Sequence, residues 1–299
     1  MSTPGAPVTP AEADVNSLAF WDARFAHSWQ ADHGPEQTRF FGELALAILP
    51  QWLHQHIQQR RLTVCDWGCA LGEGTALLAG GLGTTVTGVD FSATAIEKAK
   101  SLHPGLDFRC EDWLAHDLGD VYDVVFSSNT LEHFERPWRV FARLAQHARS
   151  HVVLLLPFRE PAESRYFEHS VSFEPANVPL SPEPGWCLID TAVSDLGPSP
   201  FWRGEQVLLV YTRSETLTEL GLSDGQCRAS RLASLAPEAA LAPVALAEAH
   251  RQRDAHAAAI QLLLTENREL RASLALARPG AAARAARWVR QLYRGRGRP

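Results

Sequence analysis

The chain has 299 residues, of which 45% are hydrophobic and 21% are charged, a balance typical of a globular protein rather than a disordered one. Its formal net charge of -6 argues against a body that binds nucleic acid through overall charge. The apolar runs fall short of the ~18 residues that a membrane-spanning helix needs. Residues 1–14 have neither the basic start nor the apolar core of a signal peptide, so we expect a cytoplasmic protein.

The cysteines follow no zinc-binding spacing, and their odd number does not suit a disulfide framework. They are Cys65, Cys69, Cys110, Cys187 and Cys227. Cys65 and Cys69 lie in an apolar stretch, which favours buried free thiols. Free thiols indicate a reducing compartment.

Composition divides the chain into successive regions. Residues 1–17 are rich in Pro, Ala and Thr and are expected to be disordered, whereas residues 18–228 carry the apolar patterns of one folded domain. The Ala- and Pro-rich residues 229–245 indicate a linker. Residues 246–277 have the spacing of a helix that can form a coiled coil, and residues 278–299 form a basic tail.

Within the folded domain, residues 36–58 have helical apolar spacing that Pro50 can divide. Short apolar strands then alternate with helices, which is typical of a parallel sheet covered on both faces. The expected strands are residues 62–68, 85–92, 106–113, 122–129 and 151–158, and the expected helices are residues 72–82, 93–103 and 136–148. Residues 159–185 carry five prolines and predict a long functional loop before two closing strands at 187–196 and 205–213.

The sharpest motif is the glycine-rich segment VCDWGCALGEGT at residues 64–75. A predicted strand ends at Asp66, and a turn containing Gly68 and Gly72 leads into a helix. In a parallel sheet such a turn lies at the carboxyl edge, where ligands bind. The segment lacks the G-x-G-x-x-G fingerprint of a dinucleotide site. Its acid would repel a pyrophosphate but suits a cationic ligand such as a sulfonium that carries an amino group.

Two further acids follow the next two predicted strands. Asp90 in VTGVDFS can accept hydrogen bonds from ribose hydroxyls, and Asp112 in CEDW can accept one from an adenine amino group beside the apolar wall of Trp113. Any one of these acids alone is better explained as a solvated loop residue. Three acids at successive strand ends, counting Asp66, indicate a nucleoside site.

Residues 62–157 resemble the class I S-adenosylmethionine-dependent methyltransferases in the segments CDWGCALGEGT, VTGVDFSATAIEKAK, CEDW and YDVVFSSNTLEHF. The resemblance implies a doubly wound α/β fold of the Rossmann-like type and S-adenosylmethionine as the cofactor. It also implies a seven-stranded, mostly parallel sheet whose last strand is antiparallel. The family pattern D-x-G-C-G-x-G has glycine where this chain has Ala70, and alanine disfavours a positive φ, so we expect a slightly reshaped loop.

The resemblance also implies cofactor-binding roles for the residues of the turn. Asp66 would face the amino group of the methionine part, through the loop or through a water molecule. Gly68 and Ala70 would provide backbone contacts, and Gly72 would complete the turn.

The other binding roles fall on the three following strand ends. Asp90, with Phe91 beside it, would hold the ribose, and Asp112 and Trp113 would frame the adenine. Asn129, at the end of the fourth strand, would lie near the methionine part and the reacting methyl group.

Methyl transfer is an in-line displacement at an activated carbon, so the enzyme needs positioning, and a base when the nucleophile is a hydroxyl. His133 in NTLEHF and His169 in YFEHSVSF follow the fourth and fifth strands and are the candidate bases. A purely orienting role is the alternative. Glu132 with His133, and Glu168 with His169, are also metal-ligand types, but no other metal signature accompanies them and we expect no metal. Aromatic residues that could line an acceptor pocket, or only pack, are Tyr166, Phe167, Phe173 and Trp186.

The C-terminal extension suggests assembly. Residues 246–277 fit a heptad repeat, and Asn267 at a seam position favours a two-stranded parallel coil, so we expect a homodimer through residues 256–277. A solitary amphipathic helix packed on its own domain is the alternative. The basic tail, with Trp288 among its arginines, has the character of a segment that contacts the inner membrane surface peripherally, and a solvated, disordered tail is an equal alternative.

Together these features favour methyl transfer to oxygen or nitrogen of a small-molecule or glycan acceptor. The glycan choice follows from the coiled-coil extension, which resembles the tails of enzymes that assemble bacterial cell-surface polysaccharides. One alternative is a nucleic-acid methyltransferase that uses the basic tail, which is disfavoured because the body has no basic stripe with aromatic platforms. Another is a non-catalytic nucleoside-binding scaffold organised by the coil.

Overall fold

The computed structural model describes residues 15–116, 119–163, 165–199 and 201–220. The expected linker at 229–245, the helix at 246–277 with its pairing segment 256–277, and the basic tail at 278–299 lie outside these residues. Residues 15–17 were expected to be disordered with the rest of 1–17, but they are part of the fold. The Asn16 side chain donates hydrogen bonds to the carbonyl oxygens of His133 at 3.0 Å and Glu168 at 2.7 Å.

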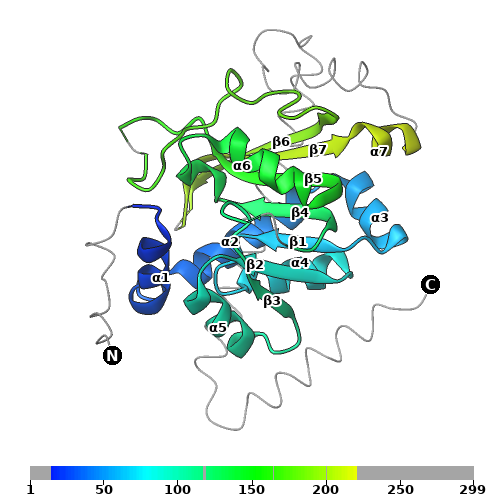
Figure 1. Ribbon diagram of the computed structural model, residues 1–299. Coiled ribbons are helices and arrows are strands. Elements are labelled where there is room, and N and C mark those ends of the chain that lie inside the picture. The colour runs from blue at the N-terminus through cyan, green and yellow to red at the C-terminus, as the bar shows by residue number, and fades with distance from the viewer. Residues whose placement is uncertain (1–14, 117–118, 164, 200, 221–299) are drawn as a thin grey trace, which may run out of the picture. The chain divides into compact units, whose positions relative to one another are not determined.

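The described residues form one seven-stranded sheet with the strand order β3-β2-β1-β4-β5-β7-β6 (Figure 1). Its strands are β1 Val64–Trp67, β2 Val86–Asp90, β3 Asp107–Cys110, β4 Tyr122–Ser128, β5 Ala148–Phe158, β6 Trp186–Pro198 and β7 Arg203–Arg213. The five neighbouring strands β3, β2, β1, β4 and β5 pair in parallel. Strand β7 runs antiparallel to both of its neighbours, β5 and β6. The expected seven-stranded, mostly parallel, doubly wound α/β sheet with an antiparallel last strand is therefore confirmed.

The helices are α1 Leu18–His27, α2 Gly34–Ile48, α3 Gln51–Arg60, α4 Glu73–Leu82, α5 Ala93–Leu102, the 3-10 turn η1 Leu131–His133, α6 Pro137–Gln146 and α7 Ser214–Glu219. As expected, the helical segment 36–58 is divided at Pro50, where α2 has ended and α3 is about to begin. In the described part of the chain, no helix combines the length and apolar character needed to cross a membrane.

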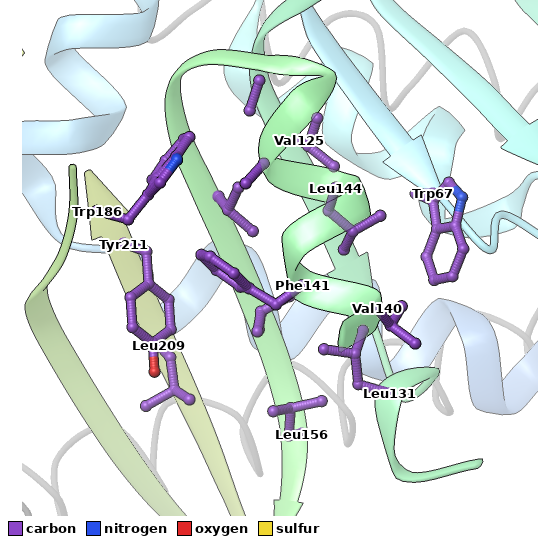
Figure 2. Close-up of a cluster of buried hydrophobic side chains, with 14 of the residues drawn as sticks. Trp67, Val125, Leu131, Val140, Phe141, Leu144, Leu156, Trp186, Leu209 and Tyr211 are labelled. Carbon is purple, nitrogen blue, oxygen red and sulfur yellow. The ribbon is translucent and has the colours of Figure 1, made fainter. Parts of the chain in front are cut away.

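Both faces of the sheet are covered by helices. Because successive side chains of a strand point to opposite faces, neighbouring residues of one strand pack into different parts of the core. On β5, Val152 and Leu154 belong to a hydrophobic cluster with Phe141 of α6. The intervening Val153 faces side chains from α2, α3 and α4 on the other side. Figure 2 shows the Phe141 ring of α6 pointing toward Tyr211 and Trp186 of the antiparallel strands, while Val140 lies beside Leu131. The core therefore continues from the parallel strands into the closing hairpin.

The insertion between β5 and β6 has no helix or strand of its own in its described residues, 159–163 and 165–185, as its prolines predict. It is held to the domain by hydrogen bonds: the Tyr211 hydroxyl donates to the carbonyl of Pro179 at 2.9 Å, and the Leu188 amide donates to that of Leu180 at 2.8 Å. Phe173 also forms a bridge with Phe158 at the end of β5. The insertion therefore has a defined path from the carboxyl end of β5 back to the opposite edge of the sheet, where β6 begins.

Candidate active site

A cavity of about 760 Å³ lies at the carboxyl ends of β1, β2 and β4. Its other walls come from α1, α2, η1, the insertion and the turn between β6 and β7. It gathers most of the residues that the sequence singled out, namely Asp66, Gly68, Ala70, Asp90, Phe91, Asp112, Trp113, Asn129, His133 and His169. Its volume is in the upper part of the range of small-molecule sites, about 300–1,000 Å³.

The glycine-rich turn between β1 and α4 has a left-handed backbone at three positions. Gly68 and Gly72 have φ of 79° and 88°, which glycine adopts without steric cost. Gly72 does not line the cavity: it lies against Phe108, whose ring would be 2.5 Å from any Cβ added there. Ala70 also has a positive φ of 48°. The expected reshaping thus takes the form of backbone strain at Ala70 itself rather than avoidance of the left-handed region.

Asp66 lies near the end of β1 and is buried beneath the turn. Its Oδ2 accepts a hydrogen bond of 2.6 Å from the hydroxyl of Thr75 in the first turns of α4. Burial raises the pKa of Asp66 to about 6, while the Thr75 hydrogen bond acts in the opposite direction. A cationic group in the cavity would favour the carboxylate and offset its loss of solvation.

Asp90, the last residue of β2, joins the turn to the second strand. Its Oδ2 accepts from the Ala70 amide at 3.0 Å, and its Oδ1 accepts from the Ser92 amide at 2.9 Å. Burial raises the pKa of Asp90 to about 6, against the effect of these two hydrogen bonds. Each oxygen keeps lone-pair capacity for one further donor, such as a ribose hydroxyl. Phe91 follows on the cavity wall.

Asp112 and Trp113 follow β3 at the same edge. One oxygen of Asp112 accepts from the amides of Leu114 at 2.9 Å and Ala115 at 3.1 Å, so the carboxylate caps a turn. The Trp113 ring is only 1% exposed and stacks on His147 with 3.9 Å between ring centroids. Trp113 therefore contributes to the cavity wall from within the hydrophobic core.

Asn129 follows β4 with a left-handed φ of 49°. Its Oδ1 accepts a hydrogen bond of 3.1 Å from the Gln206 side chain on β7, and its Nδ2 donates to the Ser128 hydroxyl at 3.0 Å. These bonds fix the orientation of the amide on the wall of the cavity.

The part of the cavity lined by Asp66, Asp90 and Asp112, called the cofactor side, fits a cationic nucleoside. Asp66, Asp90 and Asp112 offer carboxylate oxygens to an ammonium group, to ribose hydroxyls and to an adenine amino group, in that order along the sheet edge. Carboxylates also stabilise a nearby positive charge such as a sulfonium. Three hydrogen-bond-accepting carboxylates in a cavity of this size suit S-adenosylmethionine.

The part of the cavity lined by His133, His169 and the rings of Trp21, Tyr166 and Trp202 is called the acceptor side, and His133 belongs to η1. Its Nδ1 lies 3.1 Å from the carbonyl oxygen of Glu168. Because a carbonyl only accepts, Nδ1 donates to it and Nε2 is the unprotonated nitrogen of the neutral ring. Burial lowers the pKa of His133 to about 4, so the ring is neutral near physiological pH. The Trp21 ring meets it edge to face at 4.9 Å.

His169 comes from the insertion and lies beside His133, with 5.3 Å between ring centroids. Its Nδ1 donates to the Glu160 carboxylate at 2.9 Å, and its Nε2 lies 4.0 Å from the Glu132 carboxylate. Burial lowers the pKa of His169, but the hydrogen bond to Glu160 and the charges of Glu132 and Glu160 outweigh it, so the net direction is upward.

Glu132 is completely buried, and neither carboxylate oxygen has a hydrogen-bond partner among the described residues. Burial raises its pKa to about 8. One donor atom from each of Glu132, His133 and His169 lies within 4.8 Å of the others. The sequence paired Glu168 with His169, but the Glu168 carboxylate instead forms an ion pair with Arg24 of α1.

Helix α1 was not predicted, although it covers both sides of the cavity. Asp22 accepts hydrogen bonds from the hydroxyls of Ser92 at 2.6 Å and Thr94 at 2.8 Å on the cofactor side. Arg24, two residues later, binds Glu168 on the acceptor side. The available signal was Ser17, whose hydroxyl caps the helix by accepting from the Phe20 amide at 3.1 Å.

The four aromatic residues proposed for the acceptor pocket lie in different environments. Tyr166 lines the cavity and stacks on Trp202, with 5.5 Å between centroids. Phe167 is 72% exposed, while Phe173 and Trp186 belong to the hydrophobic core, so these three do not line the cavity. Trp202, in the turn between β6 and β7, takes the place that the sequence assigned to them.

A family model described as a methyltransferase domain matches residues 65–156. Several solved structures are similar to this chain at low identity. A magnesium protoporphyrin IX methyltransferase from Synechocystis PCC 6803 with bound SAM is 21% identical, over 68% of this chain and 86% of that chain, with a TM-score of 0.40. The plantazolicin methyltransferase BpumL in complex with SAH is 16% identical, over 66% and 93%, with a TM-score of 0.43.

A third solved structure, a putative methyltransferase in complex with the Trm112 methyltransferase activator of Haloferax volcanii, is 16% identical, over 64% of this chain and 97% of that chain, with a TM-score of 0.48. Among curated proteins no match is found.

The matched segment runs from β1 into β5 and contains the glycine-rich turn, Asp66, Asp90, Asp112 and Asn129. These are the elements that build the cofactor side of the cavity. Residues 65–156 therefore form a methyltransferase domain, and the cofactor that such a domain implies is S-adenosylmethionine.

Proposed function

We propose that the enzyme methylates an oxygen or nitrogen atom of a small-molecule or glycan acceptor. One observation carries the proposal: a single cavity of about 760 Å³ is lined by the cofactor-side acids Asp66 and Asp90 and also by His133 and His169. A reacting atom held between the two sides would meet the methyl group and a proton acceptor together, which is the positioning that methyl transfer needs.

The walls of the acceptor side support an acceptor that combines flat apolar faces with polar groups. Trp21, Tyr166 and Trp202 present aromatic rings there, and the imidazoles of His133 and His169 lie between them. Aromatic rings give large contact areas, and polar groups fix orientation. A sugar ring or a small hydroxylated molecule has this mixed character.

When bound, S-adenosylmethionine supplies a methyl carbon activated by its sulfonium. His169 is the proposed general base, because Glu160 holds its Nδ1 proton and so leaves Nε2 to take the proton of the acceptor. His133, whose Nδ1 is fixed on the Glu168 carbonyl, offers its Nε2 lone pair to a second donor group of the acceptor and orients it. Asp66, Asp90 and Asp112 hold the cofactor, and α1 covers the cavity against water.

The test is transfer of a labelled methyl group from S-adenosylmethionine to panels of glycans, small hydroxylated molecules, amines, RNA and DNA. We expect incorporation into one of the first three classes. His169→Asn should lower turnover ~100-fold or more at saturating acceptor, with cofactor affinity unchanged in calorimetry. His54→Asn is the control, because His54 contacts the Gly81 carbonyl on α4, away from the cavity.

Two outcomes would overturn the proposal. Incorporation into RNA or DNA alone would favour the nucleic-acid alternative. Tight cofactor binding without incorporation into any class would favour the scaffold. A full rate for His169→Asn would remove the general-base role while leaving methyl transfer in place.

We also propose, from the sequence alone, that the enzyme works in the cytoplasm as a homodimer paired through residues 256–277, with its basic tail at the inner membrane surface. The support is the heptad spacing of Ile260, Leu263, Leu270 and Leu274, with Asn267 at the seam. Such a short coil is marginal by itself, so the catalytic domains would have to contribute to pairing.

A further inference from the structure

We propose that Glu132, His133 and His169 bind one divalent first-row transition-metal ion, such as zinc, on the acceptor side of the cavity. The donor set is two imidazole nitrogens and one carboxylate oxygen. Imidazole suits zinc and its neighbours, whereas magnesium and calcium prefer oxygen ligands throughout. The proposal reverses the expectation of a metal-free site. That expectation paired Glu132 only with His133, because nothing in the sequence indicates that Glu132 and His169 lie close together in the fold.

The three donor atoms converge from two separate segments. Glu132 and His133 belong to η1, and His169 belongs to the insertion, yet their donor atoms all lie within 4.8 Å of one another. The His169 Nε2 is 4.0 Å from Glu132 Oε1. Bonds of about 2.0–2.2 Å to a tetrahedral ion separate ligand atoms by roughly 3.5 Å. Side-chain shifts of an ångström or less therefore complete the geometry.

Glu132 itself is the second observation. Its side chain is 0% exposed, and both carboxylate oxygens lack a hydrogen-bond partner among the described residues. Buried polar atoms are nearly always hydrogen-bonded, and an unpaired buried carboxyl is costly. A cation between Glu132 and the two imidazoles would give these oxygens the partner that the surrounding side chains do not provide.

The histidines are also held in the manner of metal ligands. A ligating histidine usually donates its other ring N–H to a carbonyl or a carboxylate, which fixes the ring and leaves the second nitrogen for the metal. His133 donates from Nδ1 to the Glu168 carbonyl at 3.1 Å, and His169 donates from Nδ1 to the Glu160 carboxylate at 2.9 Å. Nε2 of His169 is thereby left facing Glu132, one ring nitrogen of His133 lies in the same cluster, and three protein ligands leave an open coordination position, as in catalytic sites.

Binding of the ion is independent of the proposed function, but any effect of the ion on methyl transfer rests on that function. An open position would accept an oxygen or nitrogen of the acceptor, and the ion would lower the pKa of a hydroxyl placed there. With the ion bound, Nε2 of His169 is a ligand, so the general-base role proposed above would belong to the metal-free protein only, and the proton of the hydroxyl would pass to water.

The test measures metal binding to the untagged full chain without cofactor or acceptor. After removal of metals with a chelator, Zn²⁺ is titrated by calorimetry, and Co²⁺ is followed by its visible absorption. We expect one tight Zn²⁺ per chain and Co²⁺ bands that Zn²⁺ displaces. Glu132→Gln should weaken Zn²⁺ binding by ~10-fold or more. Even residues that only orient a ligand weaken metal binding by about 10- to 100-fold when they are replaced.

The matched control is Glu73→Gln. Glu73 is also buried and has a carboxylate oxygen without a hydrogen-bond partner, but it lies on α4 outside the cluster, so its variant should bind Zn²⁺ fully. If Glu132→Gln does not fold, His169→Asn takes its place, with the Co²⁺ spectrum as the readout. Absence of tight Zn²⁺ binding to the wild type, or equal binding by wild type and cluster variant, would overturn the proposal. Neither result depends on finding the acceptor, so failure here and failure of the proposed function are distinguishable.

Discussion

Replacing Thr75 with Val should weaken cofactor binding near neutral pH by changing the charge on Asp66. The Thr75 hydroxyl donates a hydrogen bond of 2.6 Å to Asp66 Oδ2, and burial already raises the pKa of Asp66 to about 6. Valine fills nearly the same volume without donating a hydrogen bond. Because Thr75 is fully buried, water cannot replace the lost donor. The carboxylate therefore loses its stabilising partner while its burial is unchanged.

The size of the effect follows from the strength of that bond. A hydrogen bond to a charged group contributes ~1.5–3 kcal/mol. At about 1.4 kcal/mol for each tenfold change in a protonation equilibrium, the proton affinity of Asp66 should rise by roughly ten- to a hundredfold. At pH 7 the wild-type carboxyl is about nine-tenths ionised, and the variant would be about one-tenth to one-half ionised. Cofactor affinity at pH 7 should therefore fall by about two- to ninefold.

Calorimetric titration of S-adenosylmethionine at pH 6, 7, 8 and 9 checks this. The loss for Thr75→Val should be largest at low pH and should vanish by pH 9, where Asp66 is ionised in both proteins. Thr75→Ser retains the hydroxyl and should behave as the wild type. The cofactor's own amino group also titrates in this range, but comparison of proteins at the same pH cancels that effect. Parallel pH profiles for the wild type and Thr75→Val would refute the reasoning.

Three further changes have defined expectations. Asp90→Ala removes the acceptor of the Ala70 and Ser92 amides and should weaken cofactor binding about tenfold or more in calorimetry, and unchanged affinity would remove Asp90 from the site. Ala70→Gly relieves left-handed strain of about 1–2 kcal/mol but adds unfolded-chain entropy of about 0.5–1 kcal/mol and loses methyl packing near Phe25 of about 0.8 kcal/mol. Denaturant unfolding should therefore show a net change within about 1 kcal/mol, and a loss above about 2 kcal/mol would contradict this account. Truncation before Ala245 should leave a cofactor-binding protein that is more monomeric in light scattering, and equal dimerisation would exclude pairing through residues 256–277.

The parallel core was predictable because its signals are local. Each short apolar run followed by a glycine or an acid marks a buried strand and its carboxyl end, and parallel strands bring those ends to one edge. Asp66 and Asp90 could therefore be placed in one site from the sequence, and the structure brings them to one cavity. The split of the first long helical segment at Pro50 was equally local, since proline lacks the amide that a continuing helix needs.

The acceptor side was less predictable because it depends on long-range contacts. His169 follows Glu168 in the chain, but the insertion folds so that His169 meets Glu132 and Glu160 while Glu168 turns to Arg24. No spacing rule encodes that choice. Helix α1 escaped prediction for a different reason: it follows a segment whose composition resembles a disordered leader, and only Ser17 marks where the helix begins.

The contacts of α1 have a consequence for redesign of the enzyme. Asp22 reaches Ser92 and Thr94 at the cofactor end, and Arg24, on the same helix, reaches Glu168 at the acceptor end. A substitution that shifts this helix would alter the affinities for both ligands together, so changes made there to accept a new substrate would also disturb the methyl donor. The insertion supplies Tyr166 to the acceptor side alone, which makes the insertion, with Glu160, Glu168 and His169 kept, the better segment to randomise when a new acceptor specificity is sought.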